Sequence, residues 1–163
     1  MTVNVKPAGT RGTPRPRALR PLMAVGARIF TAMFRRRGGK MRVAGQPLLV
    51  LTTIGAKSGK EREAMLGYWD DPTATDGSIL VVGSNQGAAV QSAWLLNMAA
   101  HHDQVWVERA GVKTRVLPET LEGAERSAAW AMVAKPGSQY AKYETQTDRE
   151  IPIVRLRPVA PAS

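Results

Sequence analysis

The stretch LLVLTTIGAKSGKEREAMLGY, residues 48–68, contains the pattern that decides the fold. It opens with an aliphatic and β-branched run, continues through a loop with two glycines and three basic side chains, and ends in a second apolar run. A short apolar run bounded by glycine is typical of a buried strand. We therefore predict two strands, over residues 47–53 and 62–69, joined by a basic, glycine-bearing loop.

The same criterion predicts more strands on the C-terminal side of this pair. These strands cover residues 78–84, 104–108, 112–117 and 151–156, and two helices are expected over 92–101 and 121–134. Aspartate, proline and glycine in residues 70–77 predict a turn between the second and third strands. About six strands with helices inserted between pairs, rather than in strict alternation, predict an α+β fold built on a mainly antiparallel sheet or barrel. A chain of 163 residues with 44% hydrophobic side chains is sufficient for one such domain.

The N-terminal third carries the charge. The formal net charge is +10, and residues 1–60 contain 13 basic side chains and no acidic one. Residues 1–17, with several prolines and glycines, predict a disordered basic tail. Residues 18–37 predict an amphipathic basic helix, which fits either an anionic membrane surface or the protein's own core. The barrel domain is expected over residues 43–160.

Several functional classes are excluded by composition. The chain has no cysteine, which rules out disulfides, thiolate metal ligation and a catalytic thiol, and its two histidines are adjacent, so no metal site is predicted. Arg28 interrupts the first apolar stretch, which disfavours a secretory signal, and the long uncharged run over 77–102 contains too many polar residues for a membrane span. The predicted location is cytoplasmic, with the inner face of the membrane as an open alternative.

The loop after the first predicted strand is one candidate binding site. Glycines let backbone N–H groups approach an anion closely, and basic side chains neutralise it, so a phosphate-bearing ligand fits this loop. The spacing of the glycines is not that of a P-loop, and spacing alone favours a solvated basic hairpin turn over a phosphate site. The candidate residues are Gly55, Lys57, Ser58, Gly59, Lys60 and Arg62.

Two further segments are candidates. A polar glycine loop follows the third predicted strand, just before a helix, and such a place suits an anionic or heteroaromatic ligand. Its candidate residues are Ser84, Asn85, Gln86, Gly87, Trp94 and Asn97. Tyr140 and Tyr143 lie in a polar segment, where aromatic rings wall a flat ligand or cap a core.

In order and spacing, residues 48–68, 79–108 and 140–158 together resemble the deazaflavin-dependent nitroreductases of actinobacteria, also described as F420H2-dependent quinone reductases. The resemblance covers residues 46–158. It implies a split β-barrel related to the FMN-binding flavin reductases and pyridoxamine oxidases. It also implies the cofactor coenzyme F420, a 5-deazaflavin with a phosphate and a polyglutamate tail, and hydride transfer from F420H2 to a quinone, an activated alkene or a nitro compound.

The resemblance also implies roles for the candidate residues. The cations of the loop at 54–62 would meet the phosphate and the tail carboxylates, and residues 84–87 with Trp94 and Asn97 would lie against the deazaflavin. Tyr140 and Tyr143 would line the acceptor side of the ring, while no catalytic acid or base is assigned. A signature of Thr147, Arg149, Ile151 and Pro152 matches the family as well.

At several positions the sequence departs from the usual pattern of the family. These positions are Ala56, Glu61, Gly67, Asn85 and Leu95, where the family often has arginine, proline, an aromatic residue, lysine and tyrosine. The departures predict weaker cofactor binding or an altered acceptor pocket. They leave two alternatives open: an FMN-using split-barrel oxidoreductase, and a non-catalytic protein that binds cofactor, lipid or nucleic acid. Nucleic acid is disfavoured because stacking aromatics are missing from the basic segment. Split barrels often dimerise, so a second copy of the chain is a further candidate partner.

Overall fold

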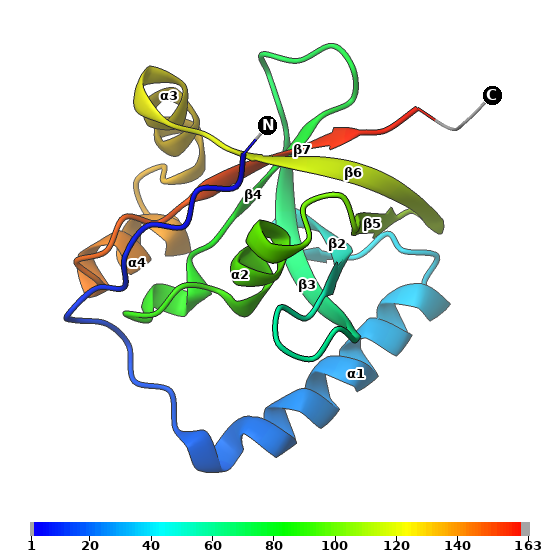
Figure 1. Ribbon diagram of the computed structural model, residues 1–163, viewed down its shortest axis with the longest axis horizontal. Coiled ribbons are helices and arrows are strands. Elements are labelled where there is room, and N and C mark those ends of the chain that lie inside the picture. The colour runs from blue at the N-terminus through cyan, green and yellow to red at the C-terminus, as the bar shows by residue number, and fades with distance from the viewer. Residues whose placement is uncertain (1, 161–163) are drawn as a thin grey trace.

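The computed structural model describes residues 2–160, in which six antiparallel strands close into a barrel beside a long first helix, α1 (Figure 1). The barrel runs in the order β2, β3, β4, β7, β6, β5, and β2 also pairs with β5, which closes the ring. This confirms the predicted α+β split barrel. The strands are β1 (Arg42–Val43), β2 (Gln46–Ile54), β3 (Glu61–Asp70), β4 (Ile79–Val82), β5 (Val105–Arg109), β6 (Val112–Thr120) and β7 (Ile153–Pro158).

Helices occupy the connections. The α-helices are α1 (Arg20–Arg36), α2 (Ala93–Ala100), α3 (Gly123–Val133) and α4 (Gln139–Gln146), and short 3-10 turns are η1 (Arg17–Leu19) and η2 (Asn85–Gly87). α1 falls within the predicted 18–37, and α2 and α3 fall within the two helices predicted for the barrel. α3 begins later than predicted because Leu121 N donates to Ile153 O at 2.9 Å, which continues the contact of β6 with the chain before β7.

The continuous apolar runs of the barrel strands follow from burial on both faces. In β2, Leu49 and Leu51 point into the barrel, while Leu48 and Val50 face outward and pack with Phe34 of α1. β4 behaves in the same way, with its outward side chains covered by a second cluster that includes residues of α3. A strand covered on both faces has no polar side to alternate with, so its sequence reads as one apolar run.

α2 lies against one end of the barrel and contributes to its interior. Trp94, Leu95 and Met98 belong to the same buried cluster as the inward residues of the strands. On the opposite side, α3 and α4 cover the outer face of β4 and β7, where Tyr140 and Tyr143 pack against the second cluster. The helices that carry candidate site residues are therefore held by the core.

α1 is docked by its C-terminal half. Phe34 is fully buried, and Arg35 forms ion pairs with Glu63 at 2.5 Å and with Glu108 at 2.8 Å. Hydrogen bonds that Arg35 donates to these two carboxylates raise the pKa of Arg35, and they lower the pKa of Glu108. The N-terminal half of α1 instead exposes apolar side chains, among them Leu22 at 70% and Ile29 at 65%.

Two segments without a predicted helix or strand have a defined place in the structure. Residues 2–16, predicted as part of a disordered tail, form no helix or strand but are hydrogen-bonded along the barrel, because loops distant in sequence supply their partners. The tail's first residue lies outside the described part. The segment with Tyr140 and Tyr143 is the helix α4, which begins after Ser138, whose hydroxyl accepts from Ala141 N. Its polar composition hid the helix from the apolar pattern.

Within residues 2–160, no helix is both long and apolar enough to cross a bilayer. The same part of the chain contains no cluster of three or more side chains suited to hold a metal ion.

Candidate functional site

The loop of residues 55–60 joins β2 to β3 and is shaped by its own hydrogen bonds. Gly55 N donates to Lys60 O at 2.8 Å, and Gly59 N donates to Gly55 O at 2.9 Å. Gly59 has a φ of 62°, and a Cβ on Gly55 would overlap the Ser58 hydroxyl. The two glycines that the sequence singled out are therefore required by the conformation of the loop itself.

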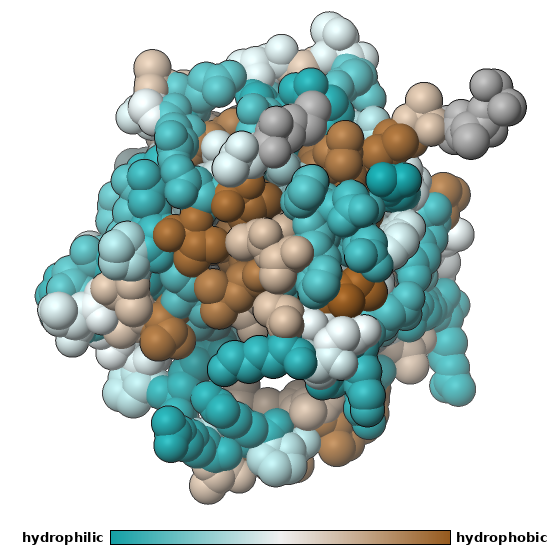
Figure 2. Space-filling view, in the orientation of Figure 1, coloured by the Kyte–Doolittle hydropathy of each residue, from teal (hydrophilic) through white to brown (hydrophobic). Residues whose placement is uncertain are grey.

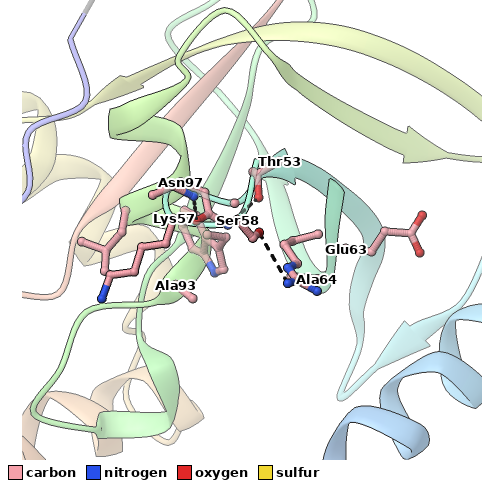
Figure 3. Close-up of a pocket in the computed structure, with 12 residues that line it drawn as sticks. Thr53, Lys57, Ser58, Glu63, Ala64, Ala93 and Asn97 are labelled. Carbon is pink, nitrogen blue, oxygen red and sulfur yellow. Dashed lines mark hydrogen bonds between the residues drawn. The ribbon is translucent and has the colours of Figure 1, made fainter. Parts of the chain in front are cut away.

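Asn97 of α2 fastens this loop to the barrel. Its side-chain amide donates to Thr53 Oγ1 at 3.0 Å, and its Oδ1 accepts from Ala56 N at 3.0 Å. Figure 3 shows Asn97 beside Lys57 and Ser58 at one side of the pocket. The amide of Asn97 is thus engaged by the protein, which gives this residue a positioning role.

A cavity of about 530 Å³, here called the loop cavity, opens between this loop and α2. Its charged side chains are Lys57, Arg62 and Glu63, and Glu63 is paired with Arg35 of α1. Lys57 and Arg62 form no ion pair within residues 2–160. The loop cavity therefore offers two cations without ion-pair partners, of which Arg62 donates one hydrogen bond, to Ser58 Oγ at 3.5 Å. It is lined by Thr53, Gly55, Ala56, Lys57, Ser58, Arg62, Glu63, Ala64, Ala93, Trp94, Leu96 and Asn97.

A second cavity, of about 600 Å³, is here called the tyrosine cavity. It shares Ala93 and Trp94 with the loop cavity, so the two are neighbours on either side of the start of α2. Figure 2 shows the surface hollowed between α1 and the barrel. The cavity is lined by Arg15, Ala27, Phe30, Val43, Leu48, Met65, Leu66, Gly67, Val82, Ser84, Asn85, Gln86, Ser92, Ala93, Trp94, Gln139, Tyr140 and Tyr143.

The polar loop after β4 has an unusual backbone. Asn85, Gln86 and Gly87 have φ values of 46°, 54° and 77°, three left-handed residues in succession. Asparagine tolerates this region, but glutamine rarely adopts it, and such strain is retained only where the surroundings impose it. Asn85 Nδ2 donates to Val90 O at 3.0 Å, which holds one turn of the loop.

Hydrogen bonds from the Arg149 side chain stabilise this conformation. Its guanidinium donates to Ala88 O at 2.8 Å, to Gly83 O at 3.0 Å and to Ser84 O at 2.7 Å, and also to Gln91 Oε1 at 2.9 Å. The side chain is buried, and burial lowers its pKa. The planar guanidinium suits several acceptors at once, so one side chain organises the whole polar loop.

The two tyrosines stand together on α4 at the wall of the tyrosine cavity. Their ring centroids are 5.9 Å apart with the planes at 90°, and Tyr140 also meets Trp69 edge-on at 5.1 Å. Burial raises the pKa of Tyr140, so its phenol stays protonated at neutral pH and is a hydrogen-bond donor. A Cβ on Gly67 would lie 2.9 Å from Gln46 Cγ and 3.5 Å from the Tyr140 hydroxyl, so the tight contact at this position is with Gln46.

The structure gathers most of the predicted residues around these two cavities. The loop cavity receives Gly55, Lys57, Ser58, Arg62, Trp94 and Asn97, and the tyrosine cavity receives Ser84, Asn85, Gln86, Trp94, Tyr140 and Tyr143. Gly59, Lys60 and Gly87 line neither cavity. Gly87 is buried against Gln146 and Thr13, where a Cβ would not fit.

Some residues that line the tyrosine cavity were not predicted from the sequence. Sequence reasoning assigned no site role to Arg15, Ala27 or Phe30, because only the tertiary fold brings the N-terminal region to the tyrosine cavity. It matched Arg149 to a family signature but assigned the residue no role.

Leu95 is fully buried in the barrel core and lines neither cavity. The presence of leucine where the family often has tyrosine therefore does not reshape either cavity directly.

Comparison with known proteins decides the family. The family model described as F420H(2)-dependent quinone reductase matches residues 26–158. The chain belongs to the F420H(2)-dependent quinone reductase family. It is 31% identical over 136 residues to the F420H(2)-dependent quinone reductase Rv1261c of Mycobacterium tuberculosis, a match that covers 79% of this chain and 87% of the relative. It is 29% identical over 115 residues to a putative F420H(2)-dependent quinone reductase, Rv3178, of the same species, covering 69% of this chain and 90% of the relative.

Solved structures agree with this assignment. An F420-H2 dependent reductase, FDR-A, matches with a TM-score of 0.58 and 30% identity, covering 72% of this chain and 99% of that chain. A chain described as a domain-swapped dimer matches with a TM-score of 0.60 and 28% identity, covering 83% and 99%. The resemblance predicted from the sequence is confirmed. As a member of this family, the chain is an F420H2-dependent oxidoreductase, and coenzyme F420 is its cofactor.

We expect Arg149→Lys to destabilise the protein by about 2–4 kcal/mol, because lysine keeps the charge but leaves several buried carbonyl groups without a donor. Urea denaturation followed by circular dichroism measures the change. Arg115→Lys is the matched control, since Arg115 is exposed and donates one hydrogen bond, to Asp103 O at 3.0 Å, so a change within about 0.5 kcal/mol is expected. Equal losses in the two variants would contradict the role assigned to Arg149.

Proposed function

We propose that the chain binds F420H2 across both cavities and directs hydride transfer to a quinone in the tyrosine cavity. The observation that carries this proposal is the wall formed by Ala93 and Trp94, which the two cavities share. One cavity presents cations and the other presents aromatic and apolar side chains. Coenzyme F420 has the matching form, with charged groups at one end and a flat ring at the other.

The loop cavity fits the charged end of the cofactor. Lys57 and Arg62 line it without ion-pair partners in the described part of the chain. The glycines of the loop let a ligand approach its backbone N–H groups closely. Charge-assisted hydrogen bonds from such groups to phosphate and carboxylate oxygens are strong. FMN carries a single phosphate, so two free cations suit the phosphate and polyglutamate tail of F420 better.

The tyrosine cavity fits the ring and the acceptor. Phe30, Met65 and Leu66 give it apolar walls, and Tyr140 contributes a protonated phenol. F420H2, when bound, supplies the hydride, and the protein positions the acceptor, excludes water and offers hydrogen-bond donors. A quinone matches apolar walls with polar groups at one side; activated alkenes and nitro compounds are the other acceptors of the same chemistry.

Titration with oxidised F420, with FMN in parallel, tests the cofactor assignment. We expect F420 to bind well ahead of FMN in a fluorescence titration, and F420H2 to be oxidised when menadione is added. Lys57→Gln and Arg62→Gln are each expected to weaken F420 binding about tenfold, because each removes a charge-assisted hydrogen bond.

Lys113→Gln is the control for these variants, because Lys113 is exposed on β6 and lines neither cavity. Tighter binding of FMN than of F420 would favour the flavin alternative. Binding of F420 without oxidation of F420H2 by menadione, a nitro compound or an activated alkene would favour a binding protein.

We also propose that the N-terminal half of α1 contacts an anionic membrane, where an apolar quinone would be found. What supports this is a group of exposed apolar side chains next to basic ones, on a helix docked only by its other half. The exposed side chains are Leu19 (48%), Leu22 (70%), Met23 (50%), Val25 (52%) and Ile29 (65%). Apolar burial plus attraction to anionic lipid is the physics of interfacial helices.

Flotation with liposomes containing anionic lipid tests this contact. The native chain is expected to float, and Leu22→Glu with Ile29→Glu to remain in the soluble fraction, because charge replaces exposed apolar surface without touching the buried half of α1. Val112→Glu changes an equally exposed residue of β6, 62% exposed, and is expected to float. A native chain that stays in the soluble fraction would contradict the contact.

A second copy of the chain is the remaining proposed partner. The support is the 28% identical structure described as a domain-swapped dimer. Light scattering after size-exclusion chromatography is expected to give twice the mass of one chain; the mass of a single chain would contradict a homodimer.

A further inference from the structure

The N-terminal segment of residues 2–16, here called the strap, is hydrogen-bonded to the rest of the protein at several points between Thr2 and Thr13. Near its start, Thr120 N donates to Thr2 O at 3.1 Å and Asn4 N donates to Thr120 Oγ1 at 3.0 Å. Figure 1 shows the strap, in dark blue, running past α4 before the chain enters α1. The family model begins at residue 26, so the strap lies outside the part of the chain that the family accounts for.

The second half of the strap is fastened to the segment after α4 and to the polar loop after β4, and the polar loop lines the tyrosine cavity. Asp148 accepts from Thr10 N at 2.9 Å and from Arg11 N at 3.0 Å, and the Thr147 hydroxyl donates to Arg11 O at 2.9 Å. Thr13 N donates to Gly87 O at 2.9 Å, so the strap is joined to the strained polar loop itself.

Two glycines make this docking specific to the sequence. A Cβ on Gly9 would overlap the Asp148 carboxylate, and a Cβ on Gly12 would overlap the backbone of Ala88 and Ala89. Gly9 N also donates to Ala89 O at 2.8 Å, which requires that close approach. Any larger residue at these positions would force the strap away from the polar loop.

The strap brings Arg15 to the tyrosine cavity. Arg15 is the one charged side chain among the residues that line this cavity in the described chain. It forms no ion pair within residues 2–160. The other polar lining groups, from Ser84 to Tyr143, are neutral. Arg15 is exposed, so it lies at the solvent side of this cavity. A cation without a partner at the mouth of an otherwise uncharged cavity favours a ligand that is, or becomes, an anion.

The proposed reaction produces such an anion. A quinone that accepts a hydride gains two electrons and one proton, which leaves the product with one negative charge on oxygen. F420H2 is oxidised by loss of that hydride and releases a second hydrogen to solvent as a proton, and the product oxyanion takes one proton from solvent to give the hydroquinone. A fixed cation that faces the developing oxyanion lowers the barrier to hydride transfer.

We propose that Arg15 is a catalytic residue, which the strap holds at the tyrosine cavity so that its guanidinium stabilises the oxyanion of the reduced acceptor. This inference rests on the proposed function. It assigns to the N-terminal segment a part in the active site, and it makes Gly9, Gly12 and Asp148 the positioning residues that keep Arg15 in place.

Steady-state kinetics at saturating F420H2, with menadione varied, tests the proposal in the full-length protein. Arg15→Gln is expected to lower kcat/KM for menadione about 10- to 100-fold, at or below the loss of about 100-fold or more that follows removal of an oxyanion-hole donor. The affinity for F420 is expected to change less than twofold. Arg15→Lys is expected to recover part of the loss. Arg17→Gln, which removes an exposed cation two residues away that does not line the cavity, is expected to match the native protein.

Gly12→Val tests the strap without touching Arg15. It is expected to lower kcat/KM as Arg15→Gln does, and the double variant is expected to lose no more than either single one, because both remove the same guanidinium from the cavity. Limited proteolysis is expected to cleave the strap faster in Gly12→Val than in the native protein.

Calorimetry with two naphthoquinones gives a readout that does not depend on turnover. The compound 2-hydroxy-1,4-naphthoquinone is ionised at neutral pH and carries the oxyanion already, whereas menadione is neutral. Arg15→Gln is expected to weaken binding of the anionic compound about tenfold relative to binding of menadione. Arg17→Gln is expected to leave the ratio of the two Kd values unchanged.

An unchanged ratio in Arg15→Gln, an equal loss in Arg17→Gln, or a kinetic loss that appears only as weaker F420 binding would overturn the role of Arg15. A native protein that neither binds F420 nor oxidises F420H2 would overturn the proposed function instead, and the comparison of the two naphthoquinones would still decide whether Arg15 binds an oxyanion.

Discussion

The structure depends on one strand, β2, that is paired on both edges and buried on both faces. It pairs with β3 over Leu48–Ile54 and with β5 over Val50–Thr53, and the second pairing closes the barrel. Its inward side chains build the barrel interior, while its outward ones bind α1. The strand leads directly into the glycine-bearing loop, so the position of the cations in the loop cavity is set by the most constrained element of the fold.

The site is organised by two polar side chains whose hydrogen bonds are made mainly to other groups of the protein. Asn97 uses its amide to hold the loop of residues 55–60, and Arg149 uses its guanidinium to hold the polar loop after β4. Both are buried, so their hydrogen bonds are satisfied inside the protein and are costly to remove. Lys57, a group left free to meet a ligand, lies on the loop that Asn97 holds. Arg62 lies on β3, and the tyrosines lie on α4, which packs against the second cluster.

The basic N-terminal third is joined to the rest of the chain by charge. Residues 1–60 contain no acidic side chain, so every carboxylate partner has to come from later in the sequence. Arg35 pairs with Glu63 and Glu108, and Lys6 pairs with Glu122. Exposed pairs such as Lys6 and Glu122 contribute little free energy, whereas Phe34 and the two glycines of the strap supply packing that fixes position. The distribution of charge therefore restricts which partners the basic side chains of the N-terminal region can meet, while packing holds the region in place.

The sequence by itself determined the strands, the glycine-bearing loop, α1 and the family, because these follow from local apolar patterns and from motifs with fixed spacing. Tertiary structure alone decided that Tyr140 and Tyr143 lie on a helix, that Leu95 belongs to the core and that residues 2–16 are bound to the barrel. Each of these depends on partners far away in the chain, as in the hydrogen bond between Thr147 and Arg11. A segment of low hydropathy carries no local sign of such a partner, because many of its contacts are backbone hydrogen bonds. The need for glycine at Gly9 and Gly12 is visible only once the surface opposite them is known.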